Sequence, residues 1–121
     1  MKRAVIVLVS IVTLGGASAV ALADSTPIGP LPAGPVATID VQRGELVALG
    51  LPQRNAGRVW RVARTFDTSV VRQVSEADVG ASVVLVFRAR RAGQTTVSLA
   101  LTKGDTSGKA LESRRFRVHV H

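Results

Sequence analysis

The chain has 121 residues, the length of one domain with a single hydrophobic core, and 46% of its residues are hydrophobic. It contains no cysteine and no tyrosine, which excludes disulfides, thiolate catalysis and cysteine-based metal sites. The formal net charge is +8; without Lys2 and Arg3, the remainder holds 14 basic against 8 acidic residues, or about +6. A surplus of this size favours acidic partners.

Residues 1–23 have the pattern of a secretory signal peptide. Two basic residues follow the initiator methionine, an uncharged apolar run spans residues 4–14, and Ala21-Leu22-Ala23 offers the small side chains that a signal peptidase reads. The apolar run is shorter than the roughly 20 residues that a membrane-spanning helix needs, so we expect cleavage and no membrane anchor afterwards. The mature chain then begins at Asp24 and is exported, to the periplasm or the exterior.

Residues 24–36 carry four of the five prolines in the chain. Proline fixes φ and removes a backbone donor, so this segment is predicted to be an extended tether that holds the domain away from the processed end. The domain itself is predicted over residues 37–121.

Hydrophobic residues beyond position 36 recur with a period of two, which indicates β-strands. In the clearest strand, over residues 82–89, Val83, Leu85 and Phe87 share one face. Only residues 75–78 have a helical look, for one turn at most. The expected strands cover residues 37–41, 45–49, 59–63, 70–74, 82–89, 94–102 and 114–121.

Seven short strands without a long helical window predict an all-β fold, a two-sheet antiparallel sandwich, with a small barrel as the alternative. The sandwich is favoured because the strongest strands each have one apolar and one polar face, which suits two sheets that share one core. The residues expected in that core are Trp60, Phe87, Val97, Leu99, Phe116 and Val118.

Groups able to carry out catalysis are scarce. A serine nucleophile needs a base, but His119 is predicted on the polar face of the last strand and His121 is the last residue. The eight acidic residues are scattered and form no pair suited to glycoside chemistry. His119 and His121 share one strand face, yet two imidazoles are an incomplete metal site. We therefore expect no enzyme activity, no cofactor and no metal.

Several passages resemble one known family. Residues 87–97 (FRARRAGQTTV) look like the strand–turn–strand passage of the chagasin family, small inhibitors of papain-like cysteine proteases. Leu51-Pro52 followed by Gly57-Arg58-Val59-Trp60 is similar to the family's Asn-Pro-Thr-Thr-Gly loop and the Gly-aromatic-x-Trp sequence after it. Residues 41–46 and 116–120 resemble its opening and its last strand. The resemblance spans residues 37–121 and implies an immunoglobulin-like antiparallel β-sandwich of about seven strands.

In that family, three loops at one end of the sandwich form a wedge that enters the protease cleft and covers the catalytic cysteine. The resemblance implies an exported inhibitor of papain-like cysteine proteases that acts by reversible loop-wedge occlusion. The loops of this chain depart from the family's, since Ala56 stands where it has threonine and the third loop lacks its Pro and Trp. Carried over by position, the protease-binding residues are Gln53, Arg54, Asn55, Ala56 and Gly57 in the first loop, Gly80 and Ala81 in the second, and Lys103 and Gly104 in the third.

A second interpretation is an envelope binding module with an immunoglobulin-like fold and no inhibitory activity. Nucleic acid is not expected as a partner, because the basic residues are spread out and aromatic stacking residues are few. Binding through arginines should fall steeply with salt, whereas inhibition through loops should depend on salt only weakly. The partner would be another exported protein or an anionic polymer, held through Arg54, Arg58, Arg88, Arg90 and Arg91.

Export is predicted to remove residues 1–23, because small side chains precede the cleavage position. N-terminal sequencing of the exported protein should therefore begin at Asp24. An intact Met1 in the exported protein would contradict the predicted cleavage.

Overall fold

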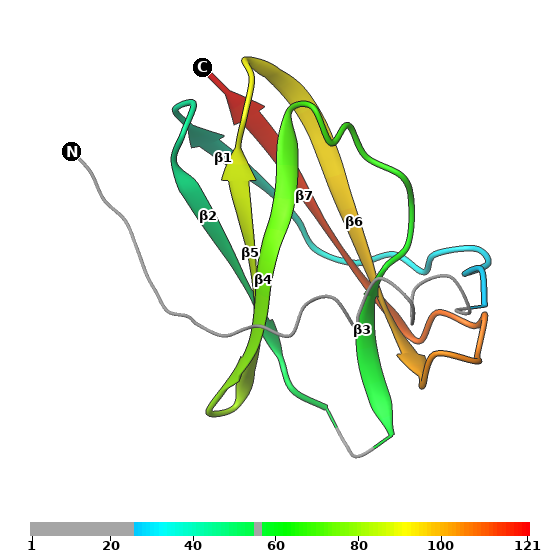
Figure 1. Cartoon of the computed structure of the whole chain (residues 1–121). Helices are drawn as coiled ribbons and strands as arrows, with labels where there is room; N and C mark the ends of the chain where they lie inside the picture. The colour runs from blue at the N-terminus through cyan, green and yellow to red at the C-terminus, as the bar shows by residue number, and fades with distance from the viewer. Residues whose placement is uncertain (1–25, 55–56) are drawn as a thin grey trace.

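The computed structural model describes residues 26–54 and 57–121, and the regular structure of these residues consists of strands (Figure 1). The predicted signal peptide lies outside this range. In the part of the chain described, no helix has the length and apolarity needed to cross a membrane. The all-β expectation is confirmed; each expected strand is found, residues 82–89 with the expected ends and the other strands with shifted ends. The strands are β1 (Val36–Val41), β2 (Leu46–Pro52), β3 (Arg58–Val62), β4 (Val71–Val79), β5 (Ser82–Ala89), β6 (Gly93–Lys103) and β7 (Glu112–Val120).

Two sheets make up the sandwich, a four-stranded sheet in the order β1-β7-β6-β3 and a three-stranded sheet in the order β2-β5-β4. Neighbouring strands are antiparallel, except that β1 runs parallel to β7, with Val36 opposite Arg115 and Val41 opposite Val120. A tight turn can join only antiparallel strands. Because the rest of the domain separates β1 from β7, no turn sets their relative direction, and the antiparallel expectation fails for this pair.

The core fills the space between the two sheets, to which each strand contributes alternate side chains. Leu85 of β5 and Leu99 and Leu101 of β6 are almost inaccessible to solvent. Phe66, from the loop before β4, meets Phe87 edge to face with ring centroids 5.8 Å apart. Of the residues expected in the core, Trp60, Phe87, Val97, Leu99 and Val118 are buried, and Phe116 is partly buried against them.

Residues 75–78 lie in β4, so the expectation of a helical turn there is wrong. A register shift between Gln73 and Ser75 marks a β-bulge in this strand. Beyond the bulge, Glu76 pairs with Leu85 and lies on the same inward face of the sheet. Without the bulge, alternation from Gln73 would place Ser75 on that face and Glu76 on the outward face. The extra residue breaks the period of two, so the residue pattern predicts a strand only as far as residue 74 and misses the rest of β4.

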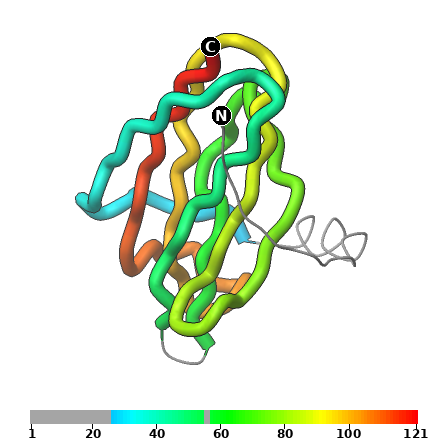
Figure 2. The backbone as a smooth tube through the Cα atoms, turned by 90° about the vertical axis from the view of Figure 1, so that its left-hand side faces the viewer, coloured from blue at the N-terminus to red at the C-terminus, as the bar shows by residue number. Residues whose placement is uncertain are grey.

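Residues 26–35 contain neither helix nor strand and lie against the domain, beside the loop between β6 and β7 (Figures 1 and 2). The Gly29 N–H donates to the Gly108 carbonyl at 2.8 Å, and the Ser113 hydroxyl donates to the Pro32 carbonyl at 2.6 Å. The segment is therefore docked onto the domain, which differs from the expectation of a tether that holds the domain away.

The outward face of β6 is buried where this segment crosses it. Ala100 lies opposite Ser113 in the sheet, and the Ser113 hydroxyl binds the segment on that face. Ser98, Ala100 and Thr102 are all buried, although they alternate with the core residues of β6 and point away from the core. The polar outward face expected for this strand is thus covered along most of its length.

Replacing Phe87 by alanine is predicted to lower the free energy of unfolding by about 3–5 kcal/mol, because the side chain is only 2% exposed and its removal leaves a cavity. Denaturant unfolding of the mature chain, followed by the fluorescence of its single tryptophan, measures the change. Val36→Ala is the control, since Val36 is 48% exposed and its truncation should change stability by about 0.5 kcal/mol or less. A loss below about 1 kcal/mol in Phe87→Ala would contradict its place in the core.

Candidate functional site

Three loops lie at one end of the sandwich, opposite the end that carries the C-terminus (Figures 1 and 2). They are the β2–β3 loop (residues 53–57), the β4–β5 turn (residues 80–81) and the β6–β7 loop (residues 104–111). We name this surface the loop end. The residues predicted from the sequence to bind a protease belong to these loops or border them; of these, Asn55 and Ala56 lie outside the described residues.

The β4–β5 turn is two residues long, because Val79 and Ser82 pair directly. Gly80 has a φ of 59°, in the left-handed region that such tight turns require. Val79 is 56% exposed, the largest fraction for a large hydrophobic side chain in the described residues. The turn therefore presents an apolar side chain beside its tip.

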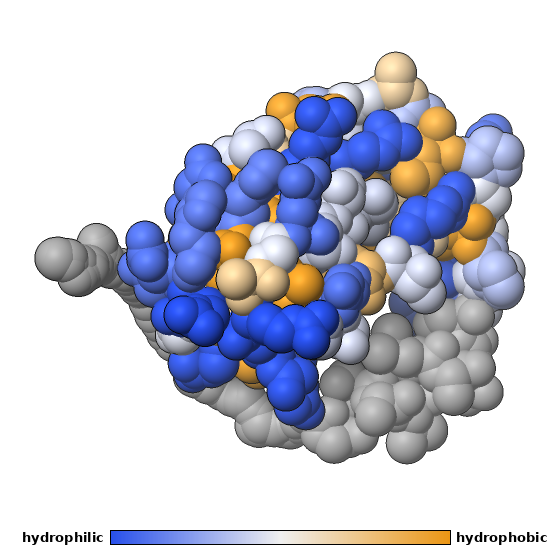
Figure 3. Space-filling model, turned by 90° about the horizontal axis from the view of Figure 1, so that it is seen from above, coloured by the Kyte–Doolittle hydropathy of each residue, from blue (hydrophilic) through white to orange (hydrophobic). Residues whose placement is uncertain are grey.

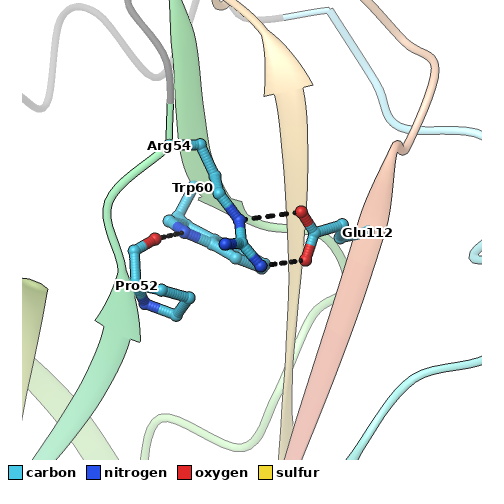
Figure 4. Close-up of polar contacts among 4 residues, drawn as sticks. All are labelled: Pro52, Arg54, Trp60 and Glu112. Atoms are coloured by element: carbon cyan, nitrogen blue, oxygen red, sulfur yellow. Dashed lines mark hydrogen bonds and ion pairs between the residues drawn. The ribbon is translucent and has the colours of Figure 1, made fainter.

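Two hydrogen bonds anchor the β2–β3 loop. The Gln53 N–H donates to the Ala81 carbonyl at 2.9 Å, which joins this loop to the β4–β5 turn. The Trp60 indole N–H donates to the Pro52 carbonyl, also at 2.9 Å (Figure 4). Because Trp60 is itself buried, this bond fixes the start of the loop relative to the core.

Arg54 extends from the β2–β3 loop to the start of β7. Its Nε and Nη2 atoms donate to the two carboxylate oxygens of Glu112, each at 2.8 Å (Figure 4). These hydrogen bonds lower the pKa of Glu112 and raise the pKa of Arg54. Both side chains remain partly exposed, so the pair fixes the position of the loop more than it stabilises the fold.

Lys103 and Gly104 lead into the β6–β7 loop. Lys103 is exposed and lies directly opposite Arg58 of β3, which places two positive charges side by side at the loop end. Gly104 has a φ of 71°, and its carbonyl accepts a hydrogen bond from the Thr102 hydroxyl at 2.8 Å. The chain thus turns sharply as β6 ends.

A groove of about 400 Å³ opens beside the loop end, between β3 and β4. Arg54 and Arg58 line it together with Glu76 and Asp78. The bulge in β4 turns both carboxylates toward the inward face and so into this groove. Partial burial raises the pKa of Glu76, and the negative charge of Asp78 raises it further. The walls of the groove therefore carry charges of both signs.

The arginines of the alternative interpretation do not form one surface. Arg54 lies in the β2–β3 loop and Arg58 directly after it, whereas Arg88 lies near the end of β5 and Arg90 and Arg91 lie in the turn after it, at the opposite end (Figure 1). That opposite end is largely hydrophilic, with hydrophobic residues in small separate patches (Figure 3). A flat partner can contact one group of arginines or the other, but not both at once.

Within residues 26–54 and 57–121, no three side chains among His, Cys, Asp and Glu come together as a possible metal site. His121 pairs with Asp40, with 3.1 Å between Nε2 and Oδ1, and both side chains are exposed at the end opposite the loops.

Sequence reasoning missed the residues that hold the loops in place. Glu112 carried no signal as the partner of Arg54, because the two residues are 58 positions apart. Trp60 was expected only as a core residue, and its bond to Pro52 depends on the meeting of two loop-flanking strands. The inward turn of Glu76 and Asp78 depends on a bulge that the residue pattern does not reveal.

Seven strands in this order, packed as two sheets, define an immunoglobulin-like sandwich.

No protein-family model matches the sequence, and no curated protein matches it either. Solved structures that share the fold include EhICP2 and PbICP-C. The cysteine protease inhibitor EhICP2 from Entamoeba histolytica has a TM-score of 0.54 at 16% identity, over 74% of this chain and 99% of that one. PbICP-C, solved in complex with falcipain-2, has a TM-score of 0.60 at 10% identity, over 79% of this chain and 95% of that one. The chagasin-like fold expected from the resemblance is therefore confirmed.

Glu112→Gln is predicted to lower stability near neutral pH and to have no effect in acid. A carboxyl group whose pKa is lowered in the folded chain stabilises the fold above its ordinary value of 4.5, and this contribution is lost as the pH falls through the folded value. Denaturant unfolding of parent and variant across this pH range measures the difference. An equal loss of stability at neutral and acid pH would contradict the role of the Arg54 pair.

Glu76→Gln is a control for which the opposite effect on stability is expected. Because the pKa of Glu76 is raised in the fold, ionisation of this carboxyl weakens the folded state as the pH rises above its ordinary value of 4.5. The Glu76→Gln variant should therefore be at least as stable as the parent near neutral pH.

Proposed function

We propose that this chain is an exported, reversible inhibitor of papain-like cysteine proteases whose loop end occludes the active-site cleft of the protease. The inhibitor excludes substrate by filling the cleft, and no bond is made or broken. One observation carries the proposal: the three loops that the sequence resemblance implies as protease-binding lie together at one end of a sandwich with the fold of EhICP2. The complex of PbICP-C with falcipain-2 supports a partner of this class.

Ordered loops support this mechanism, because a loop that is fixed before binding loses little conformational entropy on binding. The hydrogen bond from Gln53 to Ala81 joins the β2–β3 loop to the β4–β5 turn. The pair of Arg54 with Glu112 joins the β2–β3 loop to the start of β7, directly after the β6–β7 loop. The three loops can therefore enter a cleft as one unit.

The chemistry of the loop end indicates how it would hold a protease. Aromatic anchors carry much of the binding energy at many interfaces, but the β6–β7 loop has none. Val79 is the most exposed large hydrophobic side chain of the loop end, and it supplies an apolar contact instead. Lys103 and Arg58 beside each other favour an acidic rim on the protease.

Titration of the mature chain, residues 24–121, against a papain-like cysteine protease tests the proposal. Inhibition should be competitive with substrate, reversible on dilution and only weakly dependent on salt. No inhibition at micromolar concentrations of the mature chain would contradict it. Binding to an anionic polymer that is lost at high salt, without inhibition, would instead favour the envelope-module interpretation.

Gly57→Val is predicted to weaken inhibition. Gly57 has a φ of 85°, where a β-branched residue is strained by about 1–3 kcal/mol, so the β2–β3 loop should change shape. Gly44→Val is a matched control: Gly44 has a φ of 88° and equally open surroundings, but it lies in the β1–β2 turn at the opposite end.

Both glycine variants should lose similar stability in denaturant unfolding, and only Gly57→Val should raise the inhibition constant. Equal inhibition constants for the two variants would show that the β2–β3 loop does not contact the protease.

A further inference from the structure

The proline-rich segment 26–35 makes a series of backbone contacts with the β6–β7 loop. The Thr26 N–H donates to the Asp105 carbonyl at 3.0 Å, and the Gly29 N–H donates to the Gly108 carbonyl at 2.8 Å. A linker without a role in the domain would be solvated along its length. This segment instead uses its N–H groups to hold the carbonyl groups of one loop.

Two arginines at the end of β3 hold the segment from the other side. Arg61 donates from Nη1 to the Ser107 carbonyl at 2.9 Å and from Nη2 to the Thr26 carbonyl, so a single guanidinium joins the loop to the segment. Arg64 donates to the carbonyl groups of Ile28 at 3.1 Å and Gly29 at 2.9 Å.

Close backbone approach at two glycines shows that the fit of the segment is tight. A Cβ atom on Gly108 would lie 2.7 Å from the Pro27 carbonyl oxygen, and one on Gly34 would lie 2.1 Å from the Ser113 carbonyl oxygen. Both distances are too short for any side chain. Glycine thus stands at two positions where the segment and the β6–β7 loop or β7 leave no room for a side chain.

We propose that residues 26–35, which we name the N-terminal strap, position the β6–β7 loop and so form part of the inhibitory surface. This inference rests on the proposed function for its effect on inhibition. Asp105, Ser107 and Gly108 all have carbonyl groups that the strap or Arg61 holds. The prolines suit the task, because they restrict the unfolded chain and reduce the entropy lost when the strap docks. The strap therefore orders a loop that would otherwise lose entropy on binding a protease.

Gly108→Ala in the mature chain tests the strap, because the added methyl group collides with the strap backbone and not with the core. Gly29→Ala is the matched control, since a Cβ atom there lies 3.5 Å from the Gly108 carbonyl oxygen, an ordinary contact. Gly108→Ala should speed hydrogen exchange of the Thr26 and Gly29 amides and of residues 104–111, and raise the inhibition constant about tenfold. Gly29→Ala should match the parent in both measurements.

Arg61→Gln is a second variant that adds no atoms, and it removes the guanidinium that joins strap and loop. It should change exchange and inhibition in the same direction as Gly108→Ala. If Gly108→Ala were to unfold the chain, Arg61→Gln would decide the question in its place.

The outcomes separate the strap from the proposed function. Faster exchange of the strap and loop with an unchanged inhibition constant would overturn the strap's role in positioning the loop for inhibition. Unchanged hydrogen exchange in both Gly108→Ala and Arg61→Gln would overturn the inference that the strap positions the β6–β7 loop. If the parent inhibits no papain-like protease, the proposed function fails, and faster loop exchange in Gly108→Ala but not in Gly29→Ala still supports the strap.

Discussion

The two sheets are held together by the packing of β5 against β6, where Leu85 and Phe87 face the same core as Leu99 and Leu101. Each strand supplies every second residue to this contact, so a slip of one position would turn its apolar side chains toward solvent. The register of both sheets is fixed in this way. The ends of the strands are then fixed as well, and with them the end of the sandwich at which each loop emerges.

The position of β6 in the middle of the four-stranded sheet has a second consequence. Its inward face meets the core, and its outward face is buried because the N-terminal strap crosses it. Small side chains at Ser98 and Ala100 leave room for this third layer. The first residues of the strap lie beside the β6–β7 loop, so the same segment that covers the sheet also contacts the candidate binding surface.

The loop end combines hydrogen-bonded pairs that fix its loops with like charges that lie next to each other. Arg54 and Glu112 pair with each other, whereas Lys103 and Arg58 place two positive charges side by side. On the edge of the other sheet, the bulge in β4 turns Glu76 inward, where partial burial raises its pKa. Charges that weaken the isolated fold thus lie at the same end of the sandwich as the loops.

The sequence by itself determined the sandwich, because Leu85, Phe87, Leu99 and Val118 recur with the period of a strand and no long window has the period of a helix. The gaps between the expected strands contain Gly44, Gly57 and Gly80, which adopt the left-handed φ that other residues avoid. These are local properties, and a residue pattern records them.

Contacts between distant parts of the chain were decided only by the tertiary structure. The pair of Arg54 with Glu112, the parallel direction of β1 beside β7 and the docking of residues 26–35 each join segments that no local pattern connects. The prolines of the strap predict an extended backbone, and an extended backbone is compatible with both solvent and a protein surface. The strap docks on the protein surface through carbonyl groups, arginines and two glycines that come together only when the sheets have formed.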